Sequence, residues 1–245
     1  MQQTWLQTLE WDDVLPPEHK EQWKSWFSEL PLLEEVKIPR CLKDRNRKVR
    51  SVTLHTFSDA SEKAYPAAVY SRQEYEDGAI TTRLVASKTR LAPVKAVSIP
   101  SLELMGALIG LRLTTQVCSA LEIATDDVTY WVDRLNVGFW IRGQSREYKP
   151  FVAHRVGEIH EQSHPGQRRF VPTSLNPTDF GTRGMTAREL TESERWWSGP
   201  EILRHLEAEW PVCKFDKPSR EAMKSSNQHQ DRTMKIRLVL MPPYS

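Results

Sequence analysis

The pattern of apolar and polar residues between residues 51 and 87 predicts three consecutive β-strands. Each run combines alternating or densely apolar positions with β-branched residues, as half-buried strands do. The runs are centred on Val52, Leu54 and Thr56, on Ala67 and Val69, and on residues 84–86. Asp77-Gly78 is a strong hairpin turn signal between the last two runs. Pro66 stands at the start of the second run, and a sheet tolerates proline only at a strand end, an edge or a bulge.

Helical and extended patterns alternate after these strands. Pro100 suits the first turn of a helix that we predict to run to about Leu121, with leucines along one side. Small residues share another face with Glu103, and they would let the helix backbone lie close to the sheet. The other predicted elements are a strand at 128–132, helices at 136–142 and 150–162, a short strand at 170–171 and a last helical turn that begins at Asn176-Pro177. This order predicts an α/β protein built on one sheet.

The two ends of the chain differ from this middle part. Residues 1–42 are predicted to be a helical lead-in with an apolar stripe that packs on a neighbouring element. The stripe consists of Trp23, Trp26, Phe27 and Leu30. The basic run 43–50 favours a solvated linker over a phosphate-binding patch. We predict a helical connection and basic linker over 1–50, an α/β domain over 51–190, a helical C-terminal extension over 191–213 and a disordered tail over 214–245.

Composition limits the classes of protein to consider. The 245-residue chain has a net charge of +2, with 39% hydrophobic and 27% charged residues, which are ordinary values for a globular protein. Any affinity for nucleic acid must therefore come from local patches. Cys41, Cys118 and Cys213 are far apart and odd in number, which favours reduced thiols in an intracellular protein over a disulfide framework or a zinc site. No run of about 18 apolar residues occurs, so no membrane span is expected.

Four acidic residues occupy comparable places in the predicted elements. Asp59 ends the first strand, Glu103 lies in the first long helix, Asp133 ends the fourth strand and Asp179 begins the last helical turn. Acids at strand ends and on the adjoining helix can converge on one edge of a sheet. Such a cluster of hard oxygen ligands, without His or Cys, suits Mg²⁺ or Mn²⁺. Two ions about 3.5–4 Å apart would stabilise both the attacking water and the leaving 3′-oxygen of phosphodiester hydrolysis.

Several short motifs become specific when their order and spacing are taken together. They are Leu9-Glu10-Trp11-Asp12-Asp13, Ile38-Pro39-Arg40-Cys41-Leu42, Phe57-Ser58-Asp59-Ala60-Ser61, Ala92-Pro93 with Ile99-Pro100, Leu102-Glu103-Leu104, Asn176-Pro177-Thr178-Asp179 with Thr182-Arg183-Gly184, and Trp196-Trp197-Ser198-Gly199-Pro200. From about Thr4 to Pro211 the chain resembles the part of BEL/Pao-type LTR retrotransposon polyproteins that follows the reverse transcriptase. That part comprises a connection segment and a ribonuclease H domain, and it is also known as a Pao retrotransposon peptidase.

The resemblance implies a ribonuclease H-like fold, with a mixed five-stranded sheet flanked by helices after an N-terminal helical connection segment. It implies that the four acids bind two Mg²⁺ or Mn²⁺ ions and hydrolyse the RNA strand of RNA–DNA hybrids during reverse transcription. The expected partners are the hybrid and the reverse transcriptase portion of the same polyprotein, with no membrane. The expected location is the cytoplasm, in a virus-like particle, or the nucleus.

Two other functions stay open at this point. A catalytically silent remnant of the polyprotein would keep the fold and bind nucleic acid or protein. An aspartic peptidase is less favoured, because the sequence has no Asp-Thr-Gly or Asp-Ser-Gly loop.

Some positions depart from the family pattern and bear on whether the site is active. Arg134 stands where the family has a small hydroxyl residue, and an ion pair between Arg134 and Asp133 would compete with a cation. Phe170 replaces a usual histidine, which would slow product release or proton handling. Pro66 replaces an expected glycine, and Ser101 an expected arginine.

Positive side chains near the predicted acidic edge are candidates for phosphate contact, which fixes position without reading sequence. The candidates are Lys88, Arg90, Lys95, Arg142, Arg146 and Lys149, together with Ser61. An enzyme that acts on hybrids senses the shape of the helix and the 2′-hydroxyl, so we expect low sequence specificity.

Overall fold

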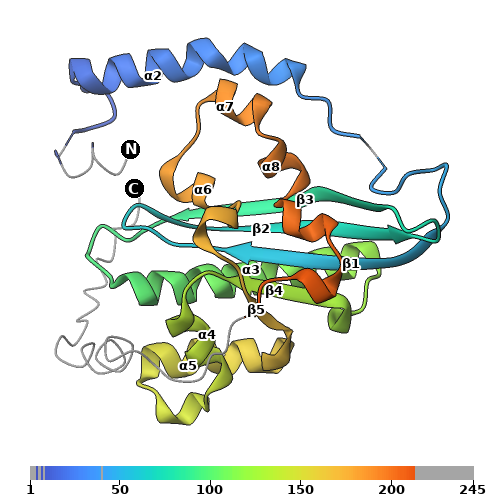
Figure 1. The fold of residues 1–245 in the computed structure, drawn as a ribbon. Helices are drawn as coiled ribbons and strands as arrows, with labels where there is room; N and C mark the ends of the chain where they lie inside the picture. The colour runs from blue at the N-terminus through green and yellow to red at the C-terminus, as the bar shows by residue number, and fades with distance from the viewer. Residues whose placement is uncertain (1–3, 5–6, 8, 40, 213–245) are drawn as a thin grey trace, which may run out of the picture.

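The computed structural model describes residues 4, 7, 9–39 and 41–212. The tail predicted for 214–245 lies outside these residues. Within them, a five-stranded sheet lies between two layers of helices (Figure 1). The predicted α/β class, with a mixed five-stranded sheet flanked by helices, is confirmed.

The sheet combines an antiparallel half and a parallel half. Strands β1 (Val49–Ser58), β2 (Ala64–Tyr75) and β3 (Ile80–Leu91) follow one another as antiparallel neighbours. β4 (Val128–Val132) pairs parallel to β1, and β5 (Arg168–Phe170) pairs parallel to β4. The strand order is therefore β3-β2-β1-β4-β5, which places β1 at the centre.

The fifth strand begins at Arg168, two residues before the predicted start. The prediction missed this start because Arg168 is a charged residue that is buried. Arg168 is only 2% exposed, and its guanidinium lies 3.9 Å from the centre of the Tyr130 ring. Its Nη2 donates to the hydroxyl of Ser163. An apolar pattern does not reveal a strand whose inward residue is a stacked guanidinium.

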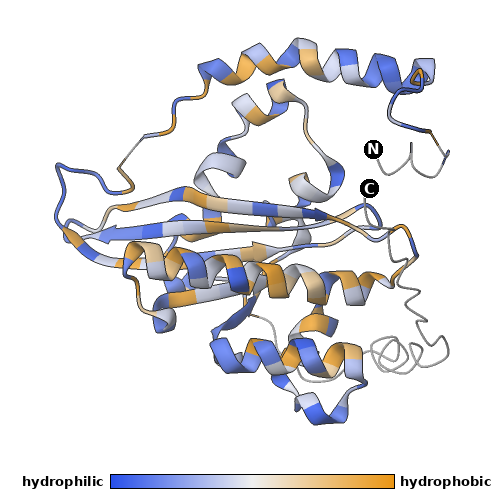
Figure 2. Cartoon of the chain, turned by 180° about the vertical axis from the view of Figure 1, so that it is seen from behind, coloured by the Kyte–Doolittle hydropathy of each residue, from blue (hydrophilic) through white to orange (hydrophobic). Residues whose placement is uncertain are grey.

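One face of the sheet is covered by α3 (Ile99–Leu121), α4 (Leu135–Arg142) and α5 (Pro150–Gln162), each within about one residue of its predicted bounds. Figure 2 shows α3 lying along the sheet, with α5 beside it. Apolar side chains from these helices meet Leu54 and Val69 in the largest core cluster. In the described part of the chain, α3 is the one helix long and apolar enough to cross a membrane, and here it is the core helix of the domain.

Residues 179–212 cover the opposite face, so this layer begins before the predicted C-terminal extension at 191. Its helices are α6 (Asp179–Arg183), α7 (Ala187–Glu192), α8 (Glu194–Ser198), η6 (Glu201–Arg204) and η7 (Glu207–Glu209). Trp210 packs edge-on against Trp131, and the buried side chain of Arg72 donates to the carbonyl oxygens of Leu203 and His205. The extension therefore completes the core of the domain.

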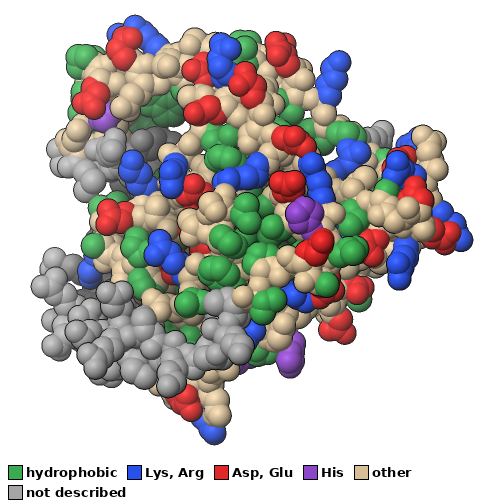
Figure 3. All heavy atoms as spheres, in the orientation of Figure 1, with side chains coloured by type: hydrophobic (Ala, Val, Ile, Leu, Met, Phe, Trp, Pro, Cys, Tyr) green, Lys and Arg blue, Asp and Glu red, His purple; other side chains and the backbone are tan. Residues whose placement is uncertain are grey.

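The remaining short helices lie in the connections. They are η2 (Thr125–Asp127), η3 (Ser145–Glu147), η4 (Pro165–Gln167) and η5 (Thr173–Leu175). Positive and negative side chains are interspersed over the face drawn in Figure 3, in keeping with a net charge close to zero.

The N-terminal segment lies at the periphery, on the side of α7 (Figure 1). It forms α2 (Pro17–Glu29) and continues through Pro31 as η1 (Leu30–Glu35). Glu29 Oε2 accepts a hydrogen bond from the backbone N–H of Ala187. The expected apolar stripe forms, but its aromatic rings pack on one another and stay 39–57% exposed.

Small residues bring α3 close to the centre of the sheet, as the sequence predicts. A Cβ at Gly106 would lie 2.9 Å from the backbone oxygen of Asp59, and one at Gly110 would lie 3.1 Å from Cγ2 of Thr56. One turn further, the hydroxyls of Thr114 and Thr56 share a buried hydrogen bond of 2.5 Å. The first turns of α3 are thereby fixed against the end of β1.

This packing makes a prediction for two helical glycines. Gly106→Ala should lower the free energy of unfolding by about 1–3 kcal/mol, because its Cβ meets backbone that cannot move aside. Gly157→Ala in α5 should raise that free energy by about 0.5–1 kcal/mol, because nothing lies within 4 Å of its Cβ. Urea denaturation measures both changes. Equal stabilisation by the two substitutions would contradict the close approach of α3.

Candidate active site

Asp59 and Asp133 directly follow neighbouring parallel strands. Phe57 pairs with Trp131 in the β1–β4 ladder, and each acid lies two residues further along its strand. Since neighbouring strands are about 4.8 Å apart, both acids lie at the same end of the sheet. Both residues are buried, with exposed fractions of 6% for Asp59 and 8% for Asp133.

Glu103 joins these two acids from the first turns of α3. It is 5% exposed, and the contact of Gly106 with the Asp59 backbone fixes its distance from the strand end. A small hollow brings the three acids together. Its lining consists of Ser58, Asp59, Glu103, Val132, Asp133, Arg134 and Val137.

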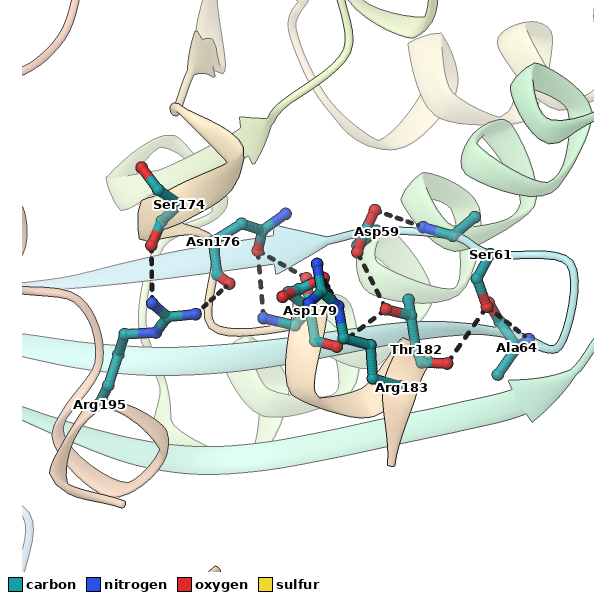
Figure 4. Close-up of polar contacts among 11 residues, drawn as sticks. Asp59, Ser61, Ala64, Ser174, Asn176, Asp179, Thr182, Arg183 and Arg195 are labelled. Atoms are coloured by element: carbon teal, nitrogen blue, oxygen red, sulfur yellow. Dashed lines mark hydrogen bonds and ion pairs between the residues drawn. The ribbon is translucent and has the colours of Figure 1, made fainter. Parts of the chain in front are cut away.

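Asp179 reaches the same end of the sheet through a tight turn. Asn176 Nδ2 donates to the backbone oxygen of Ser58 at 3.0 Å, at the end of β1. Asn176 Oδ1 accepts from the backbone N–H and the hydroxyl of Thr178, at 3.2 and 2.6 Å (Figure 4). The turn is thus tied to β1 just before Asp179 begins α6. We refer to Asp59, Glu103, Asp133 and Asp179 as the acidic edge.

Helix α6 also docks on the loop between β1 and β2. The hydroxyl of Thr182 donates to Asp59 Oδ2 at 3.4 Å, and the hydroxyl of Ser61 donates to the backbone oxygen of Thr182 at 3.2 Å. Pro66 is the third residue of β2 and packs against Gly181, where an added Cβ would lie 2.7 Å from the proline Cβ. Pro66 therefore lies near the strand end, as expected, and its ring helps to seat α6.

Arg195 supports the turn from α8, and nothing in the sequence pattern indicated this role. Its guanidinium donates to the backbone oxygens of Ser174 at 2.6 Å and Asn176 at 3.2 Å. It also lies 4.5 Å from the centre of the Phe180 ring. The carbonyl groups that it binds are 19 and 21 residues away in the sequence, so no local periodicity could have found them.

Burial and mutual repulsion raise the pKa values of the clustered acids. Burial raises the pKa of Asp59 to about 6, and the charges of Asp133 and Asp179 act in the same direction. Burial raises the pKa of Glu103 to about 8, although the nearby Arg134 opposes the shift. Burial also raises the pKa of Asp133. Each group favours its neutral form chiefly because burial removes the water that would solvate its charge, and for Asp59 and Glu103 neighbouring like charges add to the shift.

Two arginines lie against the acidic edge. Arg134 Nε lies 3.3 Å from Glu103 Oε1, so the ion pair expected between Arg134 and Asp133 is corrected: its partner is Glu103. Arg183 Nε lies 3.0 Å from Asp179 Oδ1. The arginine side chains are 57% and 76% exposed, whereas the carboxylates of Glu103 and Asp179 are 6% and 20% exposed, so solvent screens each pair from the arginine side only.

The chemistry of the acidic edge fits a divalent cation of the Mg²⁺ or Mn²⁺ type. All its donors are carboxylate oxygens, and Asp133 Oδ2 is buried with no hydrogen-bond partner among the described residues. Over the same residues, no three acidic, His or Cys side chains surround a common point closely enough to hold an ion. Arg134 and Arg183 supply positive charge beside the acids in this arrangement.

The structure separates the candidate phosphate contacts into groups. Lys88 and Arg90 are exposed on β3, and Lys95 is exposed in the loop before α3. Arg142 Nη2 donates to the backbone oxygen of Arg168 at the start of β5, where Arg168 pairs with Tyr130, three residues before Asp133. The last two candidates, Arg146 and Lys149, lie in the connection between α4 and α5.

Solved structures with some likeness to this chain include two ribonuclease H domains. The N-terminal RNase H domain of a Mycobacterium tuberculosis protein, solved as a fusion with maltose-binding protein, is 16% identical and has a TM-score of 0.35; the match covers 54% of this chain and 91% of that one. RNase H1 from the halophilic archaeon Halobacterium salinarum NRC-1 is 16% identical, with a TM-score of 0.31, and the match covers 51% and 88%. Likenesses this distant say nothing about activity.

A family model gives the clearer result. No curated protein matches the chain. The model described as a Pao retrotransposon-like RNaseH-like domain matches residues 1–134, which contain three of the four acids. Because the match covers more than half of the 245 residues, the chain belongs to the family of Pao retrotransposon-like RNaseH-like domains.

Proposed function

We propose that this chain is a metal-dependent ribonuclease H that hydrolyses the RNA strand of RNA–DNA hybrids. The observation that carries the proposal is the convergence of four acids, far apart in the sequence, on one end of the sheet. Three of them are buried there at the cost of raised pKa values. A structure that needed these positions only for packing would be more stable with neutral residues.

The residues around the acidic edge have distinct parts in this function. Asp59, Glu103 and Asp133, with Asp179 beside them, would hold two Mg²⁺ or Mn²⁺ ions. When bound, these ions supply charge stabilisation to the phosphodiester and lower the pKa of water. Thr182 and the backbone N–H of Ala60 donate to the two oxygens of Asp59 and orient that carboxylate.

In this role the chain acts on the hybrid made by the reverse transcriptase portion of its polyprotein. We place this activity in the cytoplasm, in a virus-like particle, or in the nucleus, where reverse transcription would supply the substrate.

A silent binding remnant is the second candidate, and the two arginines favour it. Arg134 and Arg183 already neutralise part of the acidic edge, and a cation must displace them or share their partners. Both side chains extend into solvent, so moving them costs little. We therefore rank the active enzyme first. A peptidase ranks last, since the sequence contains neither Asp-Thr-Gly nor Asp-Ser-Gly.

The cleavage assay uses a labelled RNA–DNA hybrid with Mg²⁺ or Mn²⁺. The wild type should cut the RNA strand, and Asp59→Asn should reduce the rate by on the order of 10²-fold or more, because several kcal/mol of charge stabilisation are lost. Asp126→Asn, an exposed acid just before β4, is the matched control and should cut normally. Binding of the hybrid without cleavage by the wild type would favour the silent remnant.

The pairing of Arg134 with Glu103 makes a second prediction. Arg134→Ser should lower the Mn²⁺ concentration for half-maximal cleavage by about two- to fivefold, because the cation no longer competes with a guanidinium that solvent partly screens. The same variant should show a larger rise in melting temperature on adding Mn²⁺. Arg188→Ser removes an exposed arginine from α7 and serves as the control. A higher Mn²⁺ requirement in Arg134→Ser would show that Arg134 assists the site.

The raised pKa values predict how the stability of the metal-free protein depends on pH. The folded state binds protons at Asp59 and Glu103 more tightly than the unfolded state does, so the free energy of unfolding should fall as pH rises from about 4 to about 8. Asp59→Asn combined with Glu103→Gln should flatten this slope and raise stability at pH 8 by about 1–3 kcal/mol. Urea denaturation in EDTA between pH 5 and 9 measures both effects. A double variant less stable than the wild type at pH 8 would count against a repulsive acidic edge.

A further inference from the structure

A groove with a basic lining crosses the outer side of α3. Helix α3 lies on the side of the molecule turned to the viewer in Figure 2. It has a volume of about 450 Å³ and lies between the end of β3 and the first half of α5. Its lining consists of Tyr65, Lys88, Arg90, Met105, Leu108, Ile109, Arg112, His154, Arg155 and Glu158. The groove is separate from the hollow at the acidic edge, which has a different lining.

Positive charge dominates this groove. It has four Lys or Arg residues against one acid, Glu158, which is bound by both Nε and Nη2 of Arg112 at 2.5 and 2.8 Å. Lys88 and Arg90 are exposed, and neither forms an ion pair within the described part of the chain. The groove therefore presents a surplus of cations that the protein itself does not neutralise.

Arg155 is held rigidly in the wall of the groove. Its guanidinium lies 3.6 Å from the centre of the Phe151 ring, and its Nη1 donates to the Phe151 backbone oxygen at 2.9 Å. Its Nε is buried without a hydrogen-bond partner among the described residues. Because Arg155 lines the groove, its stacked guanidinium adds a positive charge that suits an anion with several oxygens.

The groove begins close to the acidic edge. Ser58 pairs with Ala67 across β1 and β2, and Ala67 pairs with Lys88 across β2 and β3. Lys88 is therefore two strand spacings, about 10 Å, from the residue that precedes Asp59. Paired residues point to the same face of a sheet, so Lys88 lies on the face that α3 covers. A nucleic-acid backbone at the acidic edge has a short path into the groove.

We propose that this groove binds the phosphate backbone of the RNA–DNA hybrid and anchors it beside the acidic edge. The inference rests on the proposed function for its ligand. Lys88 and Arg90 contact phosphates at the entrance, and Arg155 with Arg112 forms the inner wall. Such contacts fix the position of the hybrid and carry no base preference. The groove extends the binding surface to α5, which the sequence pattern did not indicate.

The test measures hybrid affinity in EDTA as a function of salt, so that binding is followed without cleavage. Each phosphate contact contributes about 0.9 to the slope of log affinity against log salt concentration. Lys88→Ala combined with Arg90→Ala should therefore lower that slope by about 2 and weaken binding by on the order of tenfold or more at 0.1 M salt. Both residues are exposed, and circular dichroism checks that the variant is folded.

The matched control removes the same charge elsewhere. Lys20→Ala combined with Arg188→Ala changes exposed residues of α2 and α7 and should leave the slope unchanged. An equal loss in the control, an unchanged slope in the groove variant, or no binding by the wild type would overturn the groove proposal. Wild-type cleavage of the hybrid is scored separately with metal. If the wild type binds the hybrid through the groove but does not cut it, the proposed function is contradicted and the groove proposal stands.

Discussion

The arrangement of this domain depends on keeping several carboxyl groups buried together at one end of a sheet. Burial removes the water that would solvate the charged carboxylates, and the like charges of neighbouring acids add to the effect, so the pKa values of Asp59 and Glu103 rise to about 6 and about 8. The fold opposes this repulsion from three sides. Gly106 fixes α3 against β1, Asn176 ties the last turn to the same strand, and Arg195 supports that turn from behind.

Much of this could be predicted from the sequence because it follows from local rules. Parallel neighbouring strands that each end on an acid must bring those acids to one sheet end. The small-residue face of α3 predicts a helix close to the sheet, and the structure confirms that prediction at Gly106 and Gly110. Proline at the start of β2 is also understandable, since Pro66 lies near the strand end and packs on α6.

What the sequence could not provide depends on contacts between distant residues. The second face of the sheet is closed by the C-terminal extension, where Trp210 packs on Trp131 across 79 positions of sequence. The partner of Arg134 was predicted to be its neighbour Asp133, yet the guanidinium reaches Glu103 on another helix. The start of β5 was missed for a similar reason. Arg168 is buried against the ring of Tyr130, and a charged residue in a buried position does not fit the apolar pattern that predicts a strand.

We propose that the acidic edge holds divalent cations that replace the two arginines. Anomalous diffraction from crystals soaked in Mn²⁺ tests it most directly, since the signal locates the metal independently of any activity. The account predicts Mn²⁺ peaks contacted by Asp59, Asp133 and Glu103, with the Arg134 side chain moved off Glu103. Crystals that show no Mn²⁺ at this end of the sheet, with the Arg134–Glu103 pair intact at saturating metal, would contradict it.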